Sequence, residues 1–229
     1  QQVAFGKRFG ELEVHPFRPD LPDIPEMVVL DNHKDNKVLS TDIWHADTTF
    51  REQPTRFSIL RCIVKPEFGG DTLWADMVSA YECLSKPVQE MITGLEALHD
   101  FKNFSLLYAD DDEGQQKLLK MRKLYPRPTH PVVRTHPDTG ERVLYVNPQF
   151  TVRILGMSVK ESDAILNLLY EQSKTPEYQF RLQWEPDTLC MWDNASVQHY
   201  ASNDYWPHRR RMERVAVMGE KPFFDPDAK

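Results

Sequence analysis

Residues 209–218 read RRRMERVAVM, a run in which charged and apolar side chains alternate. Side chains two apart in a strand point to the same face, so a strand over 210–218 would put Arg210, Met212 and Arg214 together. A guanidinium on a face shared with methionine is costly to bury unless an anion meets it. Because arginine presents a rigid fork that suits a carboxylate or a sulfonate, two such side chains could anchor two acidic ligands. The alternative is a solvated basic edge strand.

Short apolar runs recur elsewhere in the chain and predict further strands. They are rich in Val, Ile, Thr and aromatic residues and are bounded by Gly, Pro, Asp and Asn. The runs cover 27–30, 57–64, 72–75, 131–135, 143–146, 178–184, 188–192 and 214–218. Between two of them, Asp138-Thr139-Gly140 predicts a hairpin turn.

Helical spacing is less frequent, and it covers 79–84, 87–97 and 115–124. A further helix is expected after Ser158, which forms a capping box with Glu161. Strands and helices do not alternate regularly, so a parallel doubly wound sheet is disfavoured. We predict a mainly β protein with flanking helices, either a double-sheet antiparallel barrel or a jelly roll.

Size and composition restrict the class of protein. With 229 residues, we expect a single domain over residues 1–229 with a substantial core. The net charge of −7 argues against a nucleic-acid partner, because phosphate contacts need an excess of Lys and Arg. No stretch approaches the roughly 20 apolar residues of a membrane span. The cysteines lack paired ligand spacing and predict reduced core residues of a cytoplasmic protein: Cys62, Cys83 and Cys190.

The segment Trp44-His45-Ala46-Asp47 offers two potential metal ligands. In an extended strand His45 and Asp47 point to the same face, so they can bind one ion together. His199, far along the chain, is expected to supply the third ligand. Two imidazoles and one carboxylate that leave three octahedral positions open are the ligand set of non-haem Fe(II) oxygenases.

A His-x-Asp pair is a weak signal by itself, and the interpretation depends on its combination with His199 and Arg210. The other histidines are expected to be hydrogen-bonded structural or surface groups: His33, His99, His130, His136 and His208. A non-catalytic barrel that binds a metal ion or a small anion is the alternative class. Structural zinc sites normally use four protein ligands, so an open set of three disfavours it.

Five motifs together resemble one known family. They are WHADTTF at 44–50, GGDTLWAD at 69–76, THPVVRTHPDTG at 129–140, MWDN with QHYA at 191–201, and the arginine-rich run. Over nearly the whole chain the sequence resembles the taurine dioxygenase family of Fe(II)- and 2-oxoglutarate-dependent oxygenases. The resemblance implies a double-stranded β-helix (jelly roll, cupin-like), Fe(II), and 2-oxoglutarate and O2 as co-substrates. Family members usually carry a further segment before the part that starts here, so we expect the chain to lack an N-terminal segment.

The resemblance also implies roles for individual residues. His45, Asp47 and His199 match the metal ligands. Thr72 and Arg210 match the pair that binds the distal carboxylate of 2-oxoglutarate. The positions that match the substrate site are Arg214, which would hold a sulfonate, and the pocket residues His15, Phe104 and Phe150.

The implied reaction is hydroxylation of taurine, or of a similar small alkylsulfonate, next to sulfur. The product then collapses to an aldehyde and sulfite, while 2-oxoglutarate becomes succinate and CO2. Arg18 stands where the taurine enzyme has a tyrosine, and Thr41 where it has an asparagine, which leaves the substrate open. The alternative is the same chemistry on an aryloxyalkanoate or an alkyl sulfate ester. We further expect a homodimer or homotetramer without a nucleic-acid or membrane partner.

Overall fold

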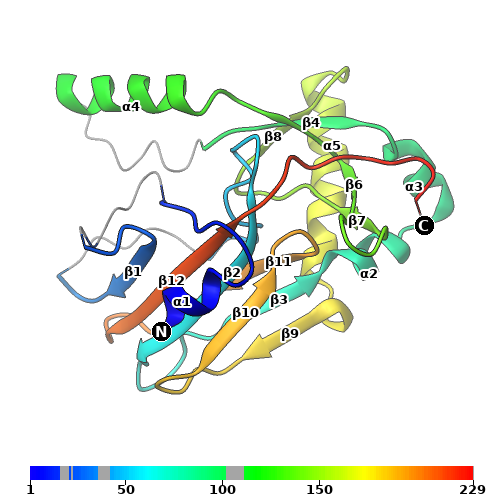
Figure 1. Cartoon of the computed structure of the whole chain (residues 1–229). Helices are drawn as coiled ribbons and strands as arrows, with labels where there is room; N and C mark the ends of the chain where they lie inside the picture. The colour runs from blue at the N-terminus through cyan, green and yellow to red at the C-terminus, as the bar shows by residue number, and fades with distance from the viewer. Residues whose placement is uncertain (16–20, 22, 36–41, 102–110, 229) are drawn as a thin grey trace.

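Strand β12 (Arg210–Met218) lies inside the largest sheet of the protein, as the computed structural model in Figure 1 shows. The structure describes residues 1–15, 21, 23–35, 42–101 and 111–228. The other strands in these ranges are β1 (Met27–Asn32), β2 (Thr55–Val64), β3 (Thr72–Asp76), β4 (Glu96–His99), β5 (Thr129–Pro131), β6 (Val133–Thr135), β7 (Arg142–Leu144), β8 (Thr151–Ile154), β9 (Gln179–Leu182), β10 (Leu189–Asp193) and β11 (Val197–Ala201). The helices are α1 (Gln2–Gly6), α2 (Met77–Glu82), α3 (Lys86–Ile92), α4 (Asp112–Leu124), α5 (Val159–Tyr170) and the short 3-10 helices η2 (Glu171–Lys174) and η3 (Pro176–Tyr178).

The largest sheet has the order β1-β12-β2-β10, and all its pairings are antiparallel. The strand predicted from the arginine-rich run is confirmed, and Arg210 and Met212 are buried while Arg211 between them is partly exposed. Val215 and Val217 are buried as well, because α1 and the segment after it pack over that part of β12. Both faces of this strand are therefore covered, although only one carries the inward arginines.

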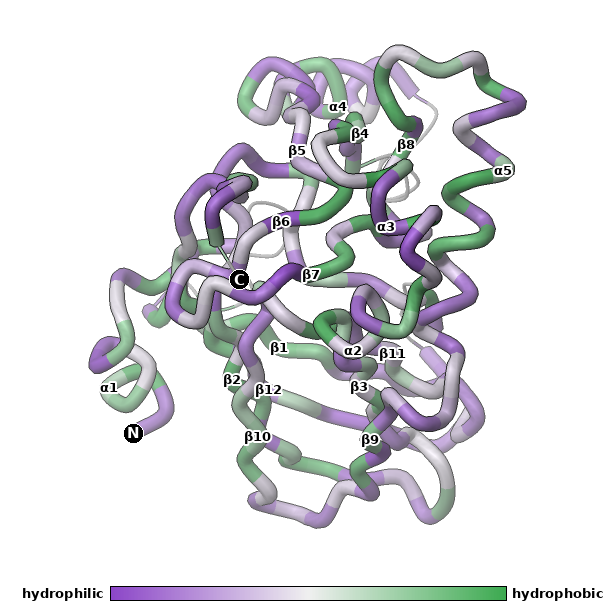
Figure 2. The backbone as a smooth tube through the Cα atoms, turned by 90° about the vertical axis from the view of Figure 1, so that its right-hand side faces the viewer, coloured by the Kyte–Doolittle hydropathy of each residue, from purple (hydrophilic) through white to green (hydrophobic). Residues whose placement is uncertain are grey.

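A second antiparallel sheet, β11-β3-β9, shares a core with the first. The core contains apolar side chains from both sheets, namely Leu60, Cys62, Trp74, Trp184, Trp192 and Met212. Figure 2 shows β2, β10 and β12 on one side and β3, β9 and β11 on the other. Two antiparallel sheets packed around one core confirm the predicted mainly β jelly roll.

Helices α2, α3 and α5 flank this core together with the small sheets β5-β4-β8 and β6-β7. Ile92 of α3, Ala97 of β4 and Leu169 of α5 belong to one buried apolar cluster. The predicted capping box is confirmed, since the Ser158 amide donates to Glu161 Oε2 (2.9 Å) and Ser158 Oγ accepts from the Glu161 amide (3.4 Å). None of the helices in the described ranges combines the length and the apolar character that a membrane crossing requires.

The structure corrects predictions about one helix and one cysteine. The helix expected over 87–97 ends at Ile92, and the chain continues as β4 from Glu96. Gly94, with φ of 81°, takes the left-handed conformation that separates the two elements, whereas the apolar spacing runs across it without a break. All three cysteines are free, but Cys83 is exposed and is not a core residue.

Candidate metal centre

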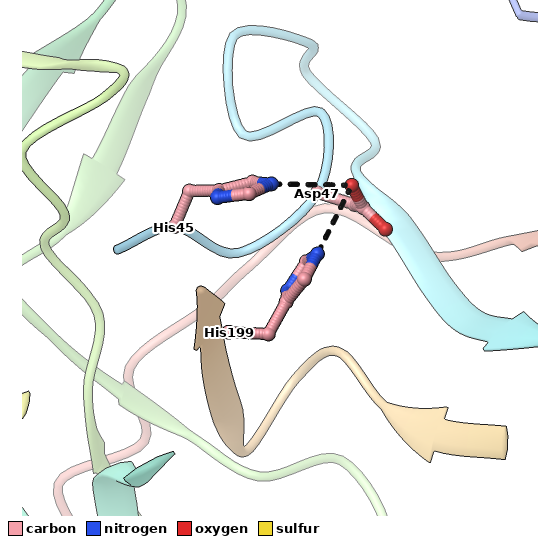
Figure 3. Close-up of side chains that lie close together, drawn as sticks. All are labelled: His45, Asp47 and His199. Carbon is pink, nitrogen blue, oxygen red and sulfur yellow. Dashed lines mark ion pairs between the residues drawn. The ribbon is translucent and has the colours of Figure 1, made fainter. Parts of the chain in front are cut away.

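His45, Asp47 and His199 meet where β11 of one sheet approaches β2 and β12 of the other. The Nε2 atoms of the two histidines each lie 3.8 Å from Oδ1 of Asp47. The ligand atoms that the three residues offer lie within 4.8 Å of one another. Figure 3 shows both imidazoles directed at the same carboxylate oxygen. The side chains are buried, with 7%, 4% and 6% of each residue exposed, so the structure brings together the three residues that the sequence singled out.

One backbone pairing holds the two histidines side by side. The His45 amide donates to the His199 carbonyl (3.0 Å), and the His199 amide donates to the His45 carbonyl (2.7 Å). Residues that exchange both bonds present their side chains to one face, and the two ring centroids are 4.1 Å apart. The prediction of an extended strand around His45 is wrong, because His45 forms only an isolated bridge with His199. The chain turns from Asp47 onward, with Thr48 at φ of 53°.

The two imidazoles are neutral and present Nε2 to the centre. Nδ1 of His45 lies 2.7 Å from the Ile43 carbonyl. Because a carbonyl only accepts, Nδ1 carries the proton and Nε2 carries the lone pair. Burial lowers the pKa of His45, and burial together with the neighbouring His45 lowers the pKa of His199 to about 3. Both rings can therefore donate a lone pair to a metal ion near neutral pH.

Asp47 is ionised and is held on both of its oxygens. Burial alone would raise its pKa, but the charge of Arg214 and the hydrogen bond from Ser58 hold the pKa well below its usual range. Arg214 Nη1 donates to Oδ1 (2.7 Å), and Ser58 Oγ donates to Oδ2 (2.6 Å). Asn194 fixes the backbone, since its Oδ1 accepts from the Asp47 amide (2.7 Å) and its Nδ2 donates to the Asp47 carbonyl (3.1 Å).

Sequence reasoning missed the contributions of Ser58 and Asn194. Asn194 is the last residue of the MWDN motif, and the motif alone does not indicate a role for this asparagine. Ser58 is a single hydroxyl within the apolar run at 57–64, and nothing local marks it. Its importance follows only from the packing of β2 against the turn that carries Asp47.

Arg210 of β12 and Thr72 of β3 form a second polar group. The guanidinium is buried, with 4% of the residue exposed; Nε donates to the Gly70 carbonyl (2.9 Å) and Nη2 donates to Thr72 Oγ1 (3.3 Å). Trp184 Nε1 also donates to Thr72 Oγ1 (2.9 Å), so this hydroxyl accepts twice and its own proton is left for another acceptor. Burial lowers the pKa of Arg210, but arginine stays protonated in proteins. The pair can therefore receive an anion.

The carboxylates near Arg210 are engaged with other groups. Arg181 Nε donates to Asp71 Oδ2 (2.6 Å), and the Gly70 amide donates to Asp204 Oδ1 (2.8 Å). Among the described residues, Arg210 forms no ion pair with a carboxylate. Gly70 has φ of 71°, and a Cβ there would lie 3.1 Å from Arg210 Cδ, so glycine is what allows this close approach. A buried cation in this situation is stabilised best by an external anion.

Of the residues expected in the substrate pocket, the structure describes Phe150 and His15 but not Phe104. Phe150 is buried beside the metal centre, with its ring centroid 6.2 Å from that of His45. His15 is buried two residues after Glu13, whose amide donates to the Ala216 carbonyl of β12 (2.8 Å). Phe104 and the two positions that depart from the taurine pattern, Arg18 and Thr41, lie outside the described residues.

The donor set fits Fe(II). Two neutral imidazole nitrogens and one carboxylate oxygen, with further positions left open, suit a non-haem iron that must also bind small molecules. A closed structural zinc site would need four protein ligands, whereas the cluster found among the described residues has three. Trp192 lies against His199, with ring centroids 4.9 Å apart, and adds an apolar wall that limits solvent access.

Comparison with known proteins agrees with this geometry. The chain matches the family model described as "Taurine catabolism dioxygenase TauD, TfdA family" over residues 1–216. It is 36% identical to an alpha-ketoglutarate-dependent sulfate ester dioxygenase of Pseudomonas putida over 226 residues, covering 96% of this chain and 73% of that protein. It is 31% identical to an alpha-ketoglutarate-dependent sulfonate dioxygenase of Saccharomyces cerevisiae, covering 97% of this chain and 55% of that protein.

The fold is shared as well. The crystal structure of a taurine dioxygenase from Burkholderia xenovorans superposes with a TM-score of 0.80 at 33% identity, covering 99% of this chain and 74% of that one. Enzymes of the matched family use Fe(II), 2-oxoglutarate (alpha-ketoglutarate) and O2. Since the family model covers residues 1–216 and the three-ligand site has the donors that this chemistry needs, the chain belongs to the TauD, TfdA family of 2-oxoglutarate-dependent non-haem iron dioxygenases.

Proposed function

We propose that this dioxygenase hydroxylates a small organosulfur anion, namely an alkylsulfonate such as taurine or an alkyl sulfate ester. The observation that carries the proposal is a pair of arginines on β12, namely the partly buried Arg214 beside Asp47 and the buried Arg210 beside Thr72. Arg214 contacts a residue of the metal centre, and Arg210 lies on the same face of the strand, so the two guanidinium groups suit two anionic ligands, a keto acid and a substrate.

In this proposal His45, Asp47 and His199 bind Fe(II) and leave three coordination positions. When bound, the iron supplies the activation of O2 that no amino-acid side chain provides. The neutral imidazoles and the ionised carboxylate are already in the protonation states that metal binding requires. Protein groups therefore do not have to lose a proton when the ion binds.

Arg210 and Thr72 would bind the distal carboxylate of 2-oxoglutarate. The guanidinium would contribute a charge-assisted hydrogen bond, and the Thr72 hydroxyl would donate its free proton to the same carboxylate. Fixing this end of the keto acid orients its other end toward the metal centre, which removes orientational freedom before the reaction.

Arg214 would bind the sulfonate or sulfate group of the substrate. Its Nε has no hydrogen-bond partner among the described residues, and its Nη1 lies 2.7 Å from Asp47 Oδ1. An anion held by this guanidinium would place the carbon next to it close to the metal centre. Phe150 would provide an apolar wall, and His15 and Phe104 would complete the pocket.

The proposed reaction is balanced by one molecule of O2. One oxygen atom enters 2-oxoglutarate, which leaves as succinate and CO2, and the other enters the substrate C–H bond next to the sulfur group. For an alkylsulfonate the C–S bond then breaks with the electron pair on sulfur, so the products are an aldehyde and hydrogen sulfite. For an alkyl sulfate ester the C–O bond breaks, and the products are an aldehyde and hydrogen sulfate. The hydroxyl proton leaves with the departing anion.

Substrate profiling tests this proposal. The purified protein would be incubated with Fe(II), 2-oxoglutarate and ascorbate, and with taurine, longer alkylsulfonates, alkyl sulfates or phenoxyacetates in parallel. Succinate, sulfite and sulfate would be measured in each reaction. We expect succinate to form in equal amounts with sulfite or sulfate for at least one sulfur compound. Succinate formation with a phenoxyacetate but with none of the sulfur anions would overturn the choice of substrate.

We also propose that the enzyme works in the cytoplasm as a homodimer or homotetramer, without a nucleic-acid or membrane partner. Its substrates are small and water-soluble, and its net charge of −7 disfavours binding to polyanions. Light scattering coupled to size-exclusion chromatography would measure the number of subunits. A monomer over the working concentration range would contradict the proposed assembly.

A further inference from the structure

The second oxygen of Asp47 is occupied by a buried hydroxyl. Ser58 Oγ donates to Oδ2 at 2.6 Å, while Oδ1 lies 3.8 Å from the Nε2 atoms of both histidines. Ser58 is 0% exposed and Asp47 is 4% exposed, so bulk water does not compete for this bond. The two carboxylate oxygens therefore have different partners: Oδ2 accepts from Ser58, whereas Oδ1 faces the imidazoles and accepts from Arg214 Nη1 (2.7 Å).

Ser58 and Asp47 have little freedom to change this arrangement. Ser58 is in the middle of β2, where its backbone is paired with β10 on one side and with β12 on the other. Asn194 bonds to the amide and the carbonyl of Asp47 (2.7 Å and 3.1 Å) and also donates to the Thr55 carbonyl at the start of β2 (2.8 Å). The carboxylate and the hydroxyl are thus fixed to the same central strand from two directions.

We infer that Ser58 is a positioning residue that keeps Asp47 a one-oxygen ligand of the metal. The inference rests on the proposed role of His45, Asp47 and His199 as ligands. A carboxylate can bind a metal ion with one or both oxygens. An octahedral ion has six positions; three one-atom ligands leave three, of which a chelating 2-oxoglutarate takes two and leaves one for O2. If both oxygens of Asp47 bound, that last position would be lost.

The choice of residue supports this role. A hydrogen bond to a carboxylate through a short O–H···O contact is among the stronger ones that a neutral side chain can form. Neighbouring inward positions of β2 are filled by Leu60 and Cys62, which belong to the apolar core between the sheets. The Ser58 hydroxyl therefore lies next to the apolar part of this strand face, at the place where the Asp47 carboxylate meets it.

The test uses Mn(II) as a paramagnetic probe in the full chain. The relaxation rate of solvent protons would be measured for the Mn(II) complex before and after saturation with 2-oxoglutarate, because it reports exchangeable water on the ion. The variants are Ser58→Ala, which removes the hydroxyl, and Ser58→Thr, which keeps it. Ser162→Ala is the matched control, since Ser162 is also a 0% exposed serine, but its Oγ accepts from the Ile154 amide (2.9 Å) rather than contacting the metal centre.

We expect the wild type, Ser162→Ala and Ser58→Thr to keep one exchangeable water in the 2-oxoglutarate complex. Ser58→Ala should bind Mn(II) and 2-oxoglutarate but show a several-fold smaller relaxation enhancement, because the freed Oδ2 of Asp47 takes the last position. Equal enhancement in Ser58→Ala and the wild type would overturn the inference. Loss of Mn(II) binding in Ser58→Ala would also overturn it, since Ser58 would then be needed for binding itself. If the wild type bound neither Mn(II) nor 2-oxoglutarate, the proposed function would fail first.

Discussion

Replacing Arg210 by alanine removes a guanidinium that is 4% exposed and that donates to the Gly70 carbonyl (2.9 Å) and to Thr72 Oγ1 (3.3 Å). If Arg210 binds the distal carboxylate of 2-oxoglutarate, the variant leaves that carboxylate buried without its cation. Truncating one partner of a buried charge pair costs about 2–5 kcal/mol, and we take about 3 kcal/mol because Thr72 still donates one hydrogen bond. At about 1.4 kcal/mol for each tenfold, the dissociation constant of 2-oxoglutarate should rise about a hundredfold.

The assay is calorimetric titration of 2-oxoglutarate into the Mn(II)-loaded protein, with the KM for 2-oxoglutarate measured in parallel by succinate formation. Arg210→Lys keeps the positive charge but loses the two-pronged hydrogen-bonding geometry of the guanidinium, so we expect about a tenfold loss of affinity for 2-oxoglutarate. Arg209→Ala is the control, because Arg209 is exposed and pairs with Asp31 (Nε–Oδ1 2.8 Å) on the outside of the same strand region. Its affinity for 2-oxoglutarate should stay within about twofold of the wild type.

The result that would refute this reasoning is an unchanged affinity for 2-oxoglutarate in Arg210→Ala. Thermal unfolding separates this result from a folding defect. Within the described residues Arg210 has no carboxylate partner, so its removal leaves no protein anion unpaired, and the melting temperature should fall only through the lost hydrogen bonds to Gly70 and Thr72 and the lost packing. A large loss of stability with normal affinity would mean that Arg210 supports the fold and not the co-substrate.

Two further substitutions test other parts of the centre, and a third tests the pH dependence of stability. Asp47→Ala should lower succinate formation by about a hundredfold or more, because the metal loses its only anionic protein ligand; activity near the wild-type level would exclude Asp47 from the centre. Thr72→Val keeps the shape of the side chain but removes the hydroxyl, so the KM for 2-oxoglutarate should rise about tenfold while kcat changes less. A large fall in kcat with an unchanged KM would contradict the role of Thr72 in binding 2-oxoglutarate. His130→Gln tests pH dependence: burial lowers the pKa of His130 from 6.5 to about 4, so the unfolded chain takes up a proton first as the pH falls. The wild type should therefore lose up to about 3 kcal/mol of stability between pH 6.5 and pH 4 through this group, and denaturant titrations should show a smaller loss in His130→Gln.

The sequence was most informative where side-chain chemistry and strand periodicity act together. Alternation in the arginine-rich run predicted a strand with Arg210 and Arg214 turned inward, and the structure has both beside polar partners of the centre. The apolar runs predicted most of the strands of the two sheets, because half-buried strands have a strong local pattern.

Other features depend on contacts between distant segments and have no local pattern. The pairing of His45 with His199 consists of two backbone hydrogen bonds across a large sequence separation, so a strand was predicted where only a bridge exists. Strand β11, which carries His199, shows little alternation because the polar residues Gln198 and His199 are adjacent and both buried. The bond from Ser58 to Asp47 appears only when β2 is packed against the turn that carries the carboxylate.

The most direct test is an anaerobic titration of the reduced protein with Fe(II) and then 2-oxoglutarate, followed by visible absorption. Chelation of the keto acid on iron held by two imidazoles and one carboxylate should produce a weak charge-transfer band in the wild type, and the band should be absent in Asp47→Ala and require far more 2-oxoglutarate in Arg210→Ala. A folded wild type that binds Fe(II) but gives no band, or an Asp47→Ala variant with an undiminished band, would show that these side chains do not hold an iron–keto acid complex.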